Sequence, residues 1–161
     1  MSCAALGLLI GTHIRWIADW AWGVPLIVVT VVIHVFGLLL IKESVEGVLS
    51  KIAERHGFQV VFTVIIGTAA LLATLLHATE GLIWATSYRM VGALPDFNSA
   101  VLYSFSAITS YGHTNLVLEQ RWQLMGALEA LNGMLLFGLT TAFLFGVIRA
   151  ASDLRKGRAR R

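Results

Sequence analysis

The sequence predicts an all-α membrane protein with three transmembrane helices and one short helix that enters the membrane without crossing it. Of its 161 residues, 57% are hydrophobic and 13% are charged, whereas an ordinary soluble domain carries about 25% charged residues. The charged residues are also clustered along the chain. Between the clusters lie three apolar stretches whose lengths are close to the ~20 residues that a helix needs to cross a bilayer. These stretches are residues 24–41, 57–79 and 124–148.

An N-terminal interfacial segment, residues 1–23, is expected before the first span. It contains three Trp residues, which favour the membrane interface, and two residues of opposite charge, Arg15 and Asp19. Its second half is therefore either a helix that lies flat on the outer surface or an outward extension of the first span. Gly23 and Pro25 predict a break before the span, because Pro is tolerated in the first turn of a helix.

Positive charges predict the orientation of the spans. Lys and Arg follow the first span and follow the third span again, where five of the last seven residues are basic. Such flanks stay in the cytoplasm, so we expect a multi-pass protein of the cell inner (plasma) membrane with its N-terminus outside and its C-terminus cytoplasmic. The basic tail, residues 151–161, is either a solvated segment that fixes this topology, which we favour, or a contact for anionic membrane lipids. Nucleic acid is not expected as a partner.

The stretch between the second and third spans, residues 92–123, is the most informative part of the chain. It opens with a Gly-Ala-Leu-Pro-Asp turn signal, and Asp96 or Asn98 is expected to cap the next helix. Residues 99–110 are apolar but too few to cross a membrane, which is typical of a re-entrant helix. Irregular backbone at membrane depth survives only where protein or a water-filled cavity surrounds it. The polar segment 109–115 therefore indicates a pore or a substrate path.

Two motifs resemble those of a known family. Residues 109–115 read Thr-Ser-Tyr-Gly-His-Thr-Asn, where a potassium-channel filter reads Thr-Thr-Val-Gly-Tyr-Gly-Asp. Residues 133–142 are similar to the Gly-x-x-x-Phe-Gly-Leu-x-Thr-Ala run of the inner helix. Residues 24–150 thus resemble the potassium-channel pore family, and the chain resembles small bacterial ion-channel proteins with an extra N-terminal span.

The resemblance implies a division of the chain and an assembly. Residues 24–56 would hold the first span and a cytoplasmic loop. Residues 57–150 would form a pore domain of outer helix, pore helix, filter loop and inner helix. One chain supplies a quarter of such a filter, so the resemblance implies a homotetramer.

The resemblance also assigns the ion-binding filter, which consists of Thr109, Ser110, Tyr111, Gly112, His113 and Thr114. A potassium filter replaces the water around the ion by backbone carbonyls from four subunits. We therefore expect no cofactor, and no metal beyond permeant K+ or Na+. Ser110 keeps a hydroxyl at the innermost site, and Gly112 keeps the first glycine, whose positive φ is cheap only for Gly. An alternative alignment places Tyr111 and Gly112 at the Tyr-Gly of the family filter. It requires gaps in the sequence on both sides of the filter, so we favour the gapless alignment.

Three departures from the family filter affect selectivity. Thr114 stands at the second glycine, where a β-branched residue at positive φ is unfavourable. Asn115 removes four negative charges from the outer mouth of a tetramer, and His113 replaces a Tyr that braces the filter. We therefore predict weak selectivity of potassium over sodium, or a pore that does not conduct. Four copies of His113 would also titrate near neutral pH, so a proton-sensitive pore is an alternative to a packed histidine.

Two acidic residues, Glu80 and Glu129, are expected near the outer ends of the second and third spans. Acids inside a membrane are costly and are usually functional or paired. In one interpretation they attract cations at the outer mouth, together with Asn115, or brace the filter loop. In the other, which we slightly favour, they hydrogen-bond to a neighbouring helix or to Arg89 or Arg121. In the first span, His34 is expected to pack or hydrogen-bond against a neighbour.

The third span contains candidate gating residues. The resemblance suggests a hinge at Gly133 and close helix packing at Gly138, although Gly is also simply frequent in membrane helices. Phe145 or Ile148, further in, would form an apolar constriction that gates by dewetting.

Together these features predict a tetrameric, potassium-channel-like cation channel that is weakly selective for monovalent cations. The alternative is a non-conducting, channel-derived structural or regulatory membrane protein, which the substitutions Thr114 and Asn115 support. An enzyme is not expected, because the chain has five scattered His, one Cys and no paired motif such as His-Glu-x-x-His. One pair, His77 and Glu80, has the spacing of two metal ligands, but it would need further ligands from neighbouring subunits.

Overall fold

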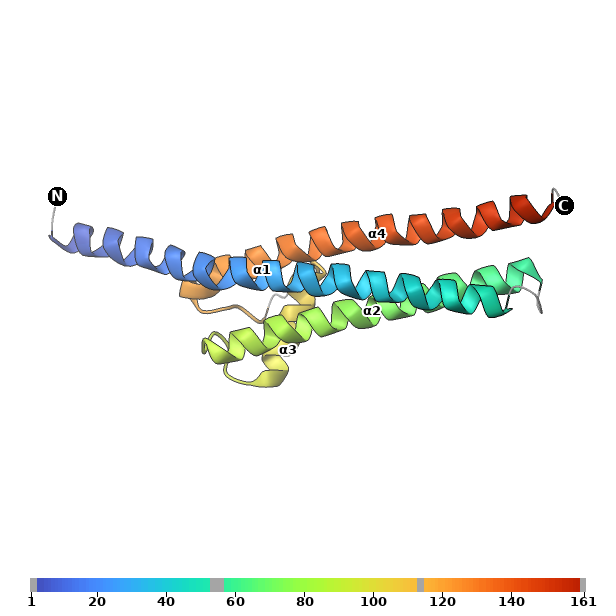
Figure 1. Cartoon of the computed structure of the whole chain (residues 1–161). Coiled ribbons are helices and arrows are strands. Elements are labelled where there is room, and N and C mark those ends of the chain that lie inside the picture. Colours follow the sequence, from blue (N-terminus) through green and yellow to red (C-terminus); the bar gives the residue numbers. More distant parts are fainter. Residues whose placement is uncertain (1–2, 53–56, 113–114, 160–161) are drawn as a thin grey trace. The chain divides into compact units, whose positions relative to one another are not determined.

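The computed structural model is all-helical over the residues that it describes, which are 3–52, 57–112 and 115–159 (Figure 1). Its elements are α1 (Cys3–Ile52), α2 (Phe58–Met90), α3 (Phe97–Ile108), the short 3-10 helix η1 (Gln120–Trp122) and α4 (Gln123–Ala159). The predicted all-α class is confirmed for this part of the chain.

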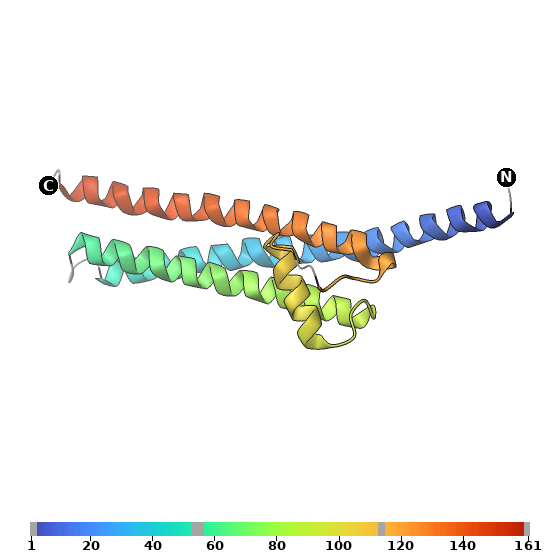
Figure 2. The ribbon, with the colours of Figure 1, turned by 180° about the vertical axis from the view of Figure 1, so that it is seen from behind.

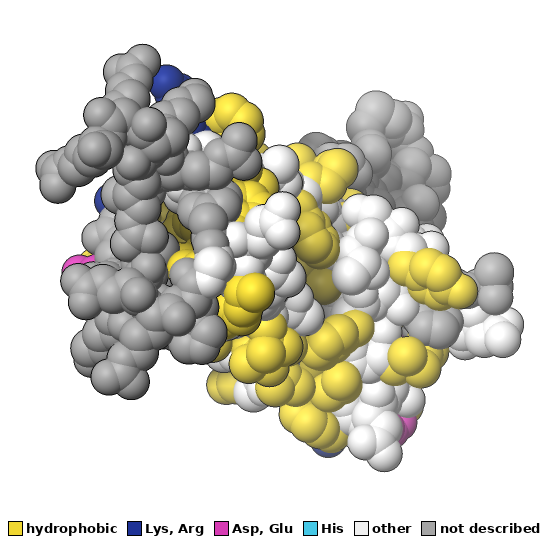
Figure 3. Space-filling view, turned by 90° about the vertical axis from the view of Figure 1, so that its right-hand side faces the viewer, with side chains coloured by type: hydrophobic (Ala, Val, Ile, Leu, Met, Phe, Trp, Pro, Cys, Tyr) yellow, Lys and Arg dark blue, Asp and Glu magenta, His cyan; other side chains and the backbone are white. Residues whose placement is uncertain are grey.

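Among the residues that the structure describes, three helical segments are long and apolar enough to cross a membrane, as the charge pattern predicts. They are Ile17–Val45, Gln59–Met90 and Gln120–Ser152. Only 22% of the most apolar part of each is buried within the chain. Large hydrophobic side chains therefore remain exposed, and several are visible on the face drawn in Figure 3. Such surfaces suit helices whose surroundings are lipid or other protein chains.

The break predicted at Gly23 and Pro25 is wrong, because α1 continues through both residues. Pro lacks the N–H that would bond one turn back, which usually disrupts a helix interior. In membrane helices, packing against neighbours compensates for this loss. Here Gly23 is buried, and a Cβ at this position would overlap the side chain of Leu128 in α4. The close approach of α4 thus supports α1 at the point where the sequence predicts a break.

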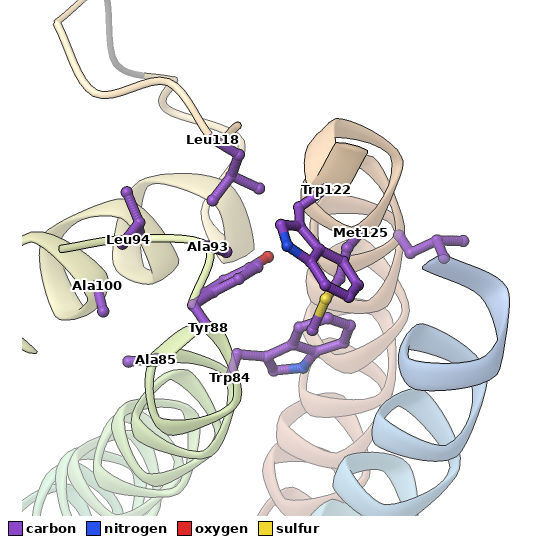
Figure 4. Close-up of a cluster of buried hydrophobic side chains, with 10 residues drawn as sticks. Trp84, Ala85, Tyr88, Ala93, Leu94, Ala100, Leu118, Trp122 and Met125 are labelled. Atoms are coloured by element: carbon purple, nitrogen blue, oxygen red, sulfur yellow. The ribbon is translucent and has the colours of Figure 1, made fainter. Parts of the chain in front are cut away.

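The chain forms two compact units. Unit 1 consists of α1 up to Val31 together with residues 79–135, and unit 2 consists of residues 32–78 and 136–161. The core of unit 1 contains several aromatic side chains: Figure 4 shows Trp84 and Tyr88 of α2 near Trp122 of η1 and Met125 of α4. This unit contains α3 and the polar segment that follows it.

The core of unit 2 is aliphatic. It joins α1 to the first half of α2 through side chains three or four residues apart on each helix, which places them on one face of each helix. The buried members are Leu38, Ile41, Val45, Val61, Ile65 and Ala69. Among the described residues of unit 2, these two helices carry two histidines, His34 on α1 and His77 on α2.

Candidate functional site

The short helix α3 begins at the cap that the sequence predicts. Asp96 has an extended backbone, and its carboxylate accepts hydrogen bonds from the Ser99 backbone N–H at 2.9 Å and the Ser99 hydroxyl at 2.7 Å. These bonds hold the pKa of Asp96 below its ordinary value. The helix has 12 residues, which corresponds to about 18 Å. This length is well short of the ~30 Å hydrocarbon core of a bilayer.

The end of α3 is a Schellman turn, which is a common way to close a helix. The backbone N–H of Tyr111 donates to the Ser106 carbonyl, and that of Ser110 donates to the Ala107 carbonyl, both at 2.9 Å. This turn requires one residue in the left-handed conformation, and that residue is Ser110, with φ 56°. An L-residue other than Gly pays about 1–2 kcal/mol for this conformation. The Thr109 hydroxyl donates to the Phe105 carbonyl at 2.6 Å.

The end of α2 is a Schellman turn of the same kind, with Gly92 in the left-handed position at φ 69°. The backbone N–H of Ala93 donates to the Tyr88 carbonyl at 2.9 Å, and the N–H of Gly92 donates to the Arg89 carbonyl at 3.2 Å. The Arg89 guanidinium also donates to the Leu94 carbonyl at 2.7 Å. These bonds fix the turn that leads into α3.

The structure describes four of the six predicted filter residues, and all four are exposed: Thr109, Ser110, Tyr111 and Gly112. Tyr111 is 80% exposed. Gly112 has φ 74°, the positive value that motivates a glycine at this position. The positive φ of Ser110 was not predicted, and it follows from the Schellman turn. His113 and Thr114 lie outside the described residues, and Asn115 is exposed.

A buried hydrogen-bond cluster ties α3 to α2 and α4. The Tyr88 hydroxyl donates to Glu129 Oε2 at 2.6 Å. The Ser104 hydroxyl lies 2.5 Å from Glu129 Oε1 and 2.7 Å from the Gly81 carbonyl oxygen. Glu129 and Ser104 are fully buried. Glu129 thus has the neighbouring-helix hydrogen bond that we slightly favour from the sequence.

The arginines that the sequence offers as alternative partners for Glu129 lie elsewhere. Arg121 forms an ion pair with Glu119 at 2.8 Å, and Arg89 holds the turn before α3. Glu80 is also fully buried in unit 1.

Two glycines of α4 let α3 pack closely against it, as small residues do in membrane helices. A Cβ on Gly133 would overlap the backbone carbonyl of Ile108, and a Cβ on Gly126 would overlap the Tyr103 hydroxyl. By contrast, a Cβ on Gly138 meets no atom of the described chain within 4 Å. Within the chain, the close approach is therefore at Gly133 rather than at Gly138. Figure 2 shows α3 crossing from α2 toward α4.

Two polar contacts join α1 to α4 in unit 1, and neither was predicted from the sequence. The Asn132 amide donates to the Thr30 hydroxyl at 2.9 Å. Asp19 is buried, 3% exposed, and its carboxylate accepts a hydrogen bond from the backbone N–H of Met125 in the first turn of α4. A carboxylate is favourable at a helix N-terminus. Asp19, assigned by sequence to the interfacial segment, is therefore part of the core.

Unit 2 contains a second polar cluster that the sequence predicts only in part. The Thr140 hydroxyl is 3.0 Å from His34 Nε2 and 3.1 Å from His77 Nε2, and the two imidazole centroids are 5.0 Å apart. His77 also stacks on Phe137 at 4.4 Å. The expectation that His34 hydrogen-bonds to a neighbour is confirmed. The two candidate gate residues, Phe145 and Ile148, are exposed on α4.

Within either unit taken alone, the described side chains bring no three His, Cys, Asp or Glu residues together as a metal-binding group. No family model matches the chain, and no curated protein or solved structure is significantly similar to it.

Proposed function

We propose that this chain is one subunit of a tetrameric, weakly selective cation channel, with the loop after α3 lining the ion path. The observation that carries the proposal is the seating of α3. A 12-residue apolar helix lies between two spans, is fixed to both of them, and ends in a turn that exposes Thr109–Gly112.

The seating of α3 supports a re-entrant loop rather than a surface hairpin. Surface loops are usually mobile and loosely packed, whereas α3 makes buried hydrogen bonds through Ser104 and a backbone contact at Gly133. At membrane depth, the polar backbone after α3 requires water or protein around it. Four copies around a common axis would provide both, because each loop would face the other three and a water-filled path.

The chemistry of the loop supports passage of cations. Backbone carbonyls and hydroxyls, as at Thr109 and Ser110, are the oxygen ligands that replace the hydration shell of K+ or Na+. Gly112 has the positive φ that allows successive carbonyls to alternate. Asn115 is neutral where the similar channel family has an acid, so the outer mouth of a tetramer lacks four charges. This loss favours weak discrimination among monovalent cations.

The exposed surface of unit 1 supports contact between copies or with lipid. α4 exposes Leu131, Met134 and Leu135, and α3 exposes Leu102. The positive flanks support an inner-membrane topology with the N-terminus outside and the basic tail on the cytoplasmic side, next to anionic lipid.

A second candidate is a non-conducting structural or regulatory protein with the same assembly. The left-handed Ser110 favours this alternative, because the backbone N–H groups of Tyr111 and Gly112 both point back to the Ser106 carbonyl. An extended filter would release these bonds. If the loop keeps this closed turn in the assembled protein, it cannot present a continuous row of carbonyls.

Ion flux through purified protein in liposomes distinguishes these functions. Potassium, sodium and calcium gradients should be tested separately, alongside a measurement of oligomeric state by native mass spectrometry. We expect a tetramer with comparable potassium and sodium flux. Potassium flux with sodium excluded would overturn the predicted weak selectivity. An intact tetramer without any flux would overturn the channel and favour the non-conducting function.

A pair of variants locates the ion path. Gly112→Ala places a Cβ at φ 74° without an overlap within 4 Å, so it strains only the loop and should abolish most flux. Thr74→Ala is the control, because its exposed hydroxyl bonds only to its own helix at the Ala70 carbonyl. Equal flux in the two variants would mean that the loop does not line the path.

A further inference from the structure

The most unusual group in unit 1 is the carboxyl of Glu129. It is fully buried on α4, and both of its polar partners in the cluster are hydroxyl groups rather than cations: Tyr88 from α2 and Ser104 from α3. A buried carboxylate normally requires a cation or several donors.

The Ser104 hydroxyl carries one hydrogen but makes two short contacts. Its oxygen is 2.7 Å from the Gly81 carbonyl oxygen and 2.5 Å from Glu129 Oε1. A carbonyl oxygen can only accept, so the Ser104 hydrogen points to Gly81. One hydrogen shared between two acceptors gives longer contacts than these, because each misses the preferred alignment. The hydrogen between Ser104 and Glu129 must therefore belong to Glu129.

The remaining groups are consistent with a neutral acid. The Tyr88 hydroxyl donates to the other oxygen, Glu129 Oε2, so each hydrogen of the cluster has one acceptor. Tyr103 of α3 packs edge-on against Tyr88 with centroids 5.3 Å apart, and burial raises the pKa of Tyr103 to about 12. This phenol therefore stays neutral. The acid contributed by α1 is Asp19, which accepts from the start of α4 rather than from this cluster.

We propose that Glu129 is a neutral carboxylic acid whose proton, donated to Ser104, positions α3 against α2 and α4. Glu129 is thus a positioning residue for the loop that follows α3. Removing the proton would leave Glu129 Oε1 and the Ser104 oxygen as two acceptors 2.5 Å apart, which must then separate. The inference concerns how α3 is held and does not depend on whether the loop conducts ions.

The conservative variant Glu129→Gln tests the proton directly. A Gln side chain has an NH2 group that can donate to Ser104 and an oxygen that can accept from Tyr88, so it reproduces the hydrogen bonds of the neutral acid. It does not titrate. Glu129→Ala removes both bonds and leaves the buried Tyr88 hydroxyl without its acceptor.

The experiment combines infrared spectroscopy with thermal unfolding of the full chain in detergent micelles. We expect the wild-type minus Glu129→Gln difference spectrum to contain the C=O stretch of a protonated carboxylic acid at neutral pH. We also expect Glu129→Gln to unfold at nearly the wild-type temperature and Glu129→Ala several degrees lower. With rising pH, the wild type should lose stability while Glu129→Gln does not.

Two results would overturn the proposal. One is a difference spectrum without the acid band at neutral pH, which would show that Glu129 is charged. The other is an unfolding temperature of Glu129→Gln as low as that of Glu129→Ala, which would show that the bonds of the neutral form do not hold α3. Neither readout involves ion flux, so failure of the proposed channel function would leave this test unaffected.

Discussion

The substitution Gly133→Ala gives the sharpest test of how α3 is seated. Gly133 lies inside α4, and a Cβ at this position would overlap the backbone carbonyl of Ile108 at the end of α3. A flexible side chain could rotate away from an added methyl group, but a helix backbone has to move as a unit. The substitution therefore pushes the end of α3, and the loop after it, away from α4.

The magnitude follows from two opposing terms. Ala in place of Gly in a helix interior gains about 1 kcal/mol. Forcing one extra methyl group into a packed site costs about 1–3 kcal/mol, and the upper end applies because the obstacle at Gly133 is backbone. We expect Gly133→Ala to lower the free energy of unfolding by about 2 kcal/mol.

Gly138→Ala is the matched control, five residues further along the same helix. A Cβ at Gly138 meets no described atom within 4 Å, so only the helix-propensity gain of about 1 kcal/mol remains. The two variants should thus differ by about 3 kcal/mol in opposite directions. Unfolding can be followed in mixed micelles by Trp fluorescence, because Trp84 and Trp122 lie in the core of unit 1. Equal stability of the two variants would refute the close approach of α3 to Gly133.

Three further predictions test other parts of the chain. Thr140→Val removes the hydroxyl between the buried His34 and the half-buried His77 and should destabilise the protein by about 1–3 kcal/mol in a chemical unfolding assay. Thr141→Val should have little effect, because that exposed hydroxyl bonds only within its own helix. Asp96 has a lowered pKa, so its contribution to stability is complete above the ordinary carboxyl value and is lost as pH falls through the lower folded-state value. Melting temperatures of Asp96→Asn, which keeps a good cap, should therefore fall less on acidification than those of the wild type, and parallel curves would contradict this. Ser110→Gly should raise the free energy of unfolding by about 1 kcal/mol, because Gly adopts positive φ without strain, and an unchanged or lower value would argue against the left-handed turn.

Those features that depend on neighbouring residues could be predicted from the sequence. The spans follow from where the charges are absent, and the cap at Asp96 follows from a polar residue directly before an apolar run. The short length of α3 also follows from its flanking turn residues. In each case the controlling interactions are within a few positions of each other along the chain.

The contacts that seat α3 could not be predicted in this way. Tyr88 and Ser104 are 41 and 25 residues from Glu129, and only the rotation of each helix about its axis brings them together. A shift of one residue in α4 would turn Glu129 away by about 100°. The continuous α1 was missed for the same reason, since the packing that supports Pro25 comes from Leu128, which is distant in sequence.

The two Schellman turns on either side of α3 bear on function, because they solve one problem with different residues. The turn after α2 has Gly92 in the left-handed position, whereas the turn after α3 has Ser110 in the same conformation at a cost of about 1–2 kcal/mol. Folding alone would favour glycine at both sites. A Gly at position 110 would relieve the strain of the left-handed backbone. That a serine stands there instead is a reason to look for a function of its side chain. Position 110 is an exposed serine, and a hydroxyl is the kind of ligand that the proposed innermost ion site requires.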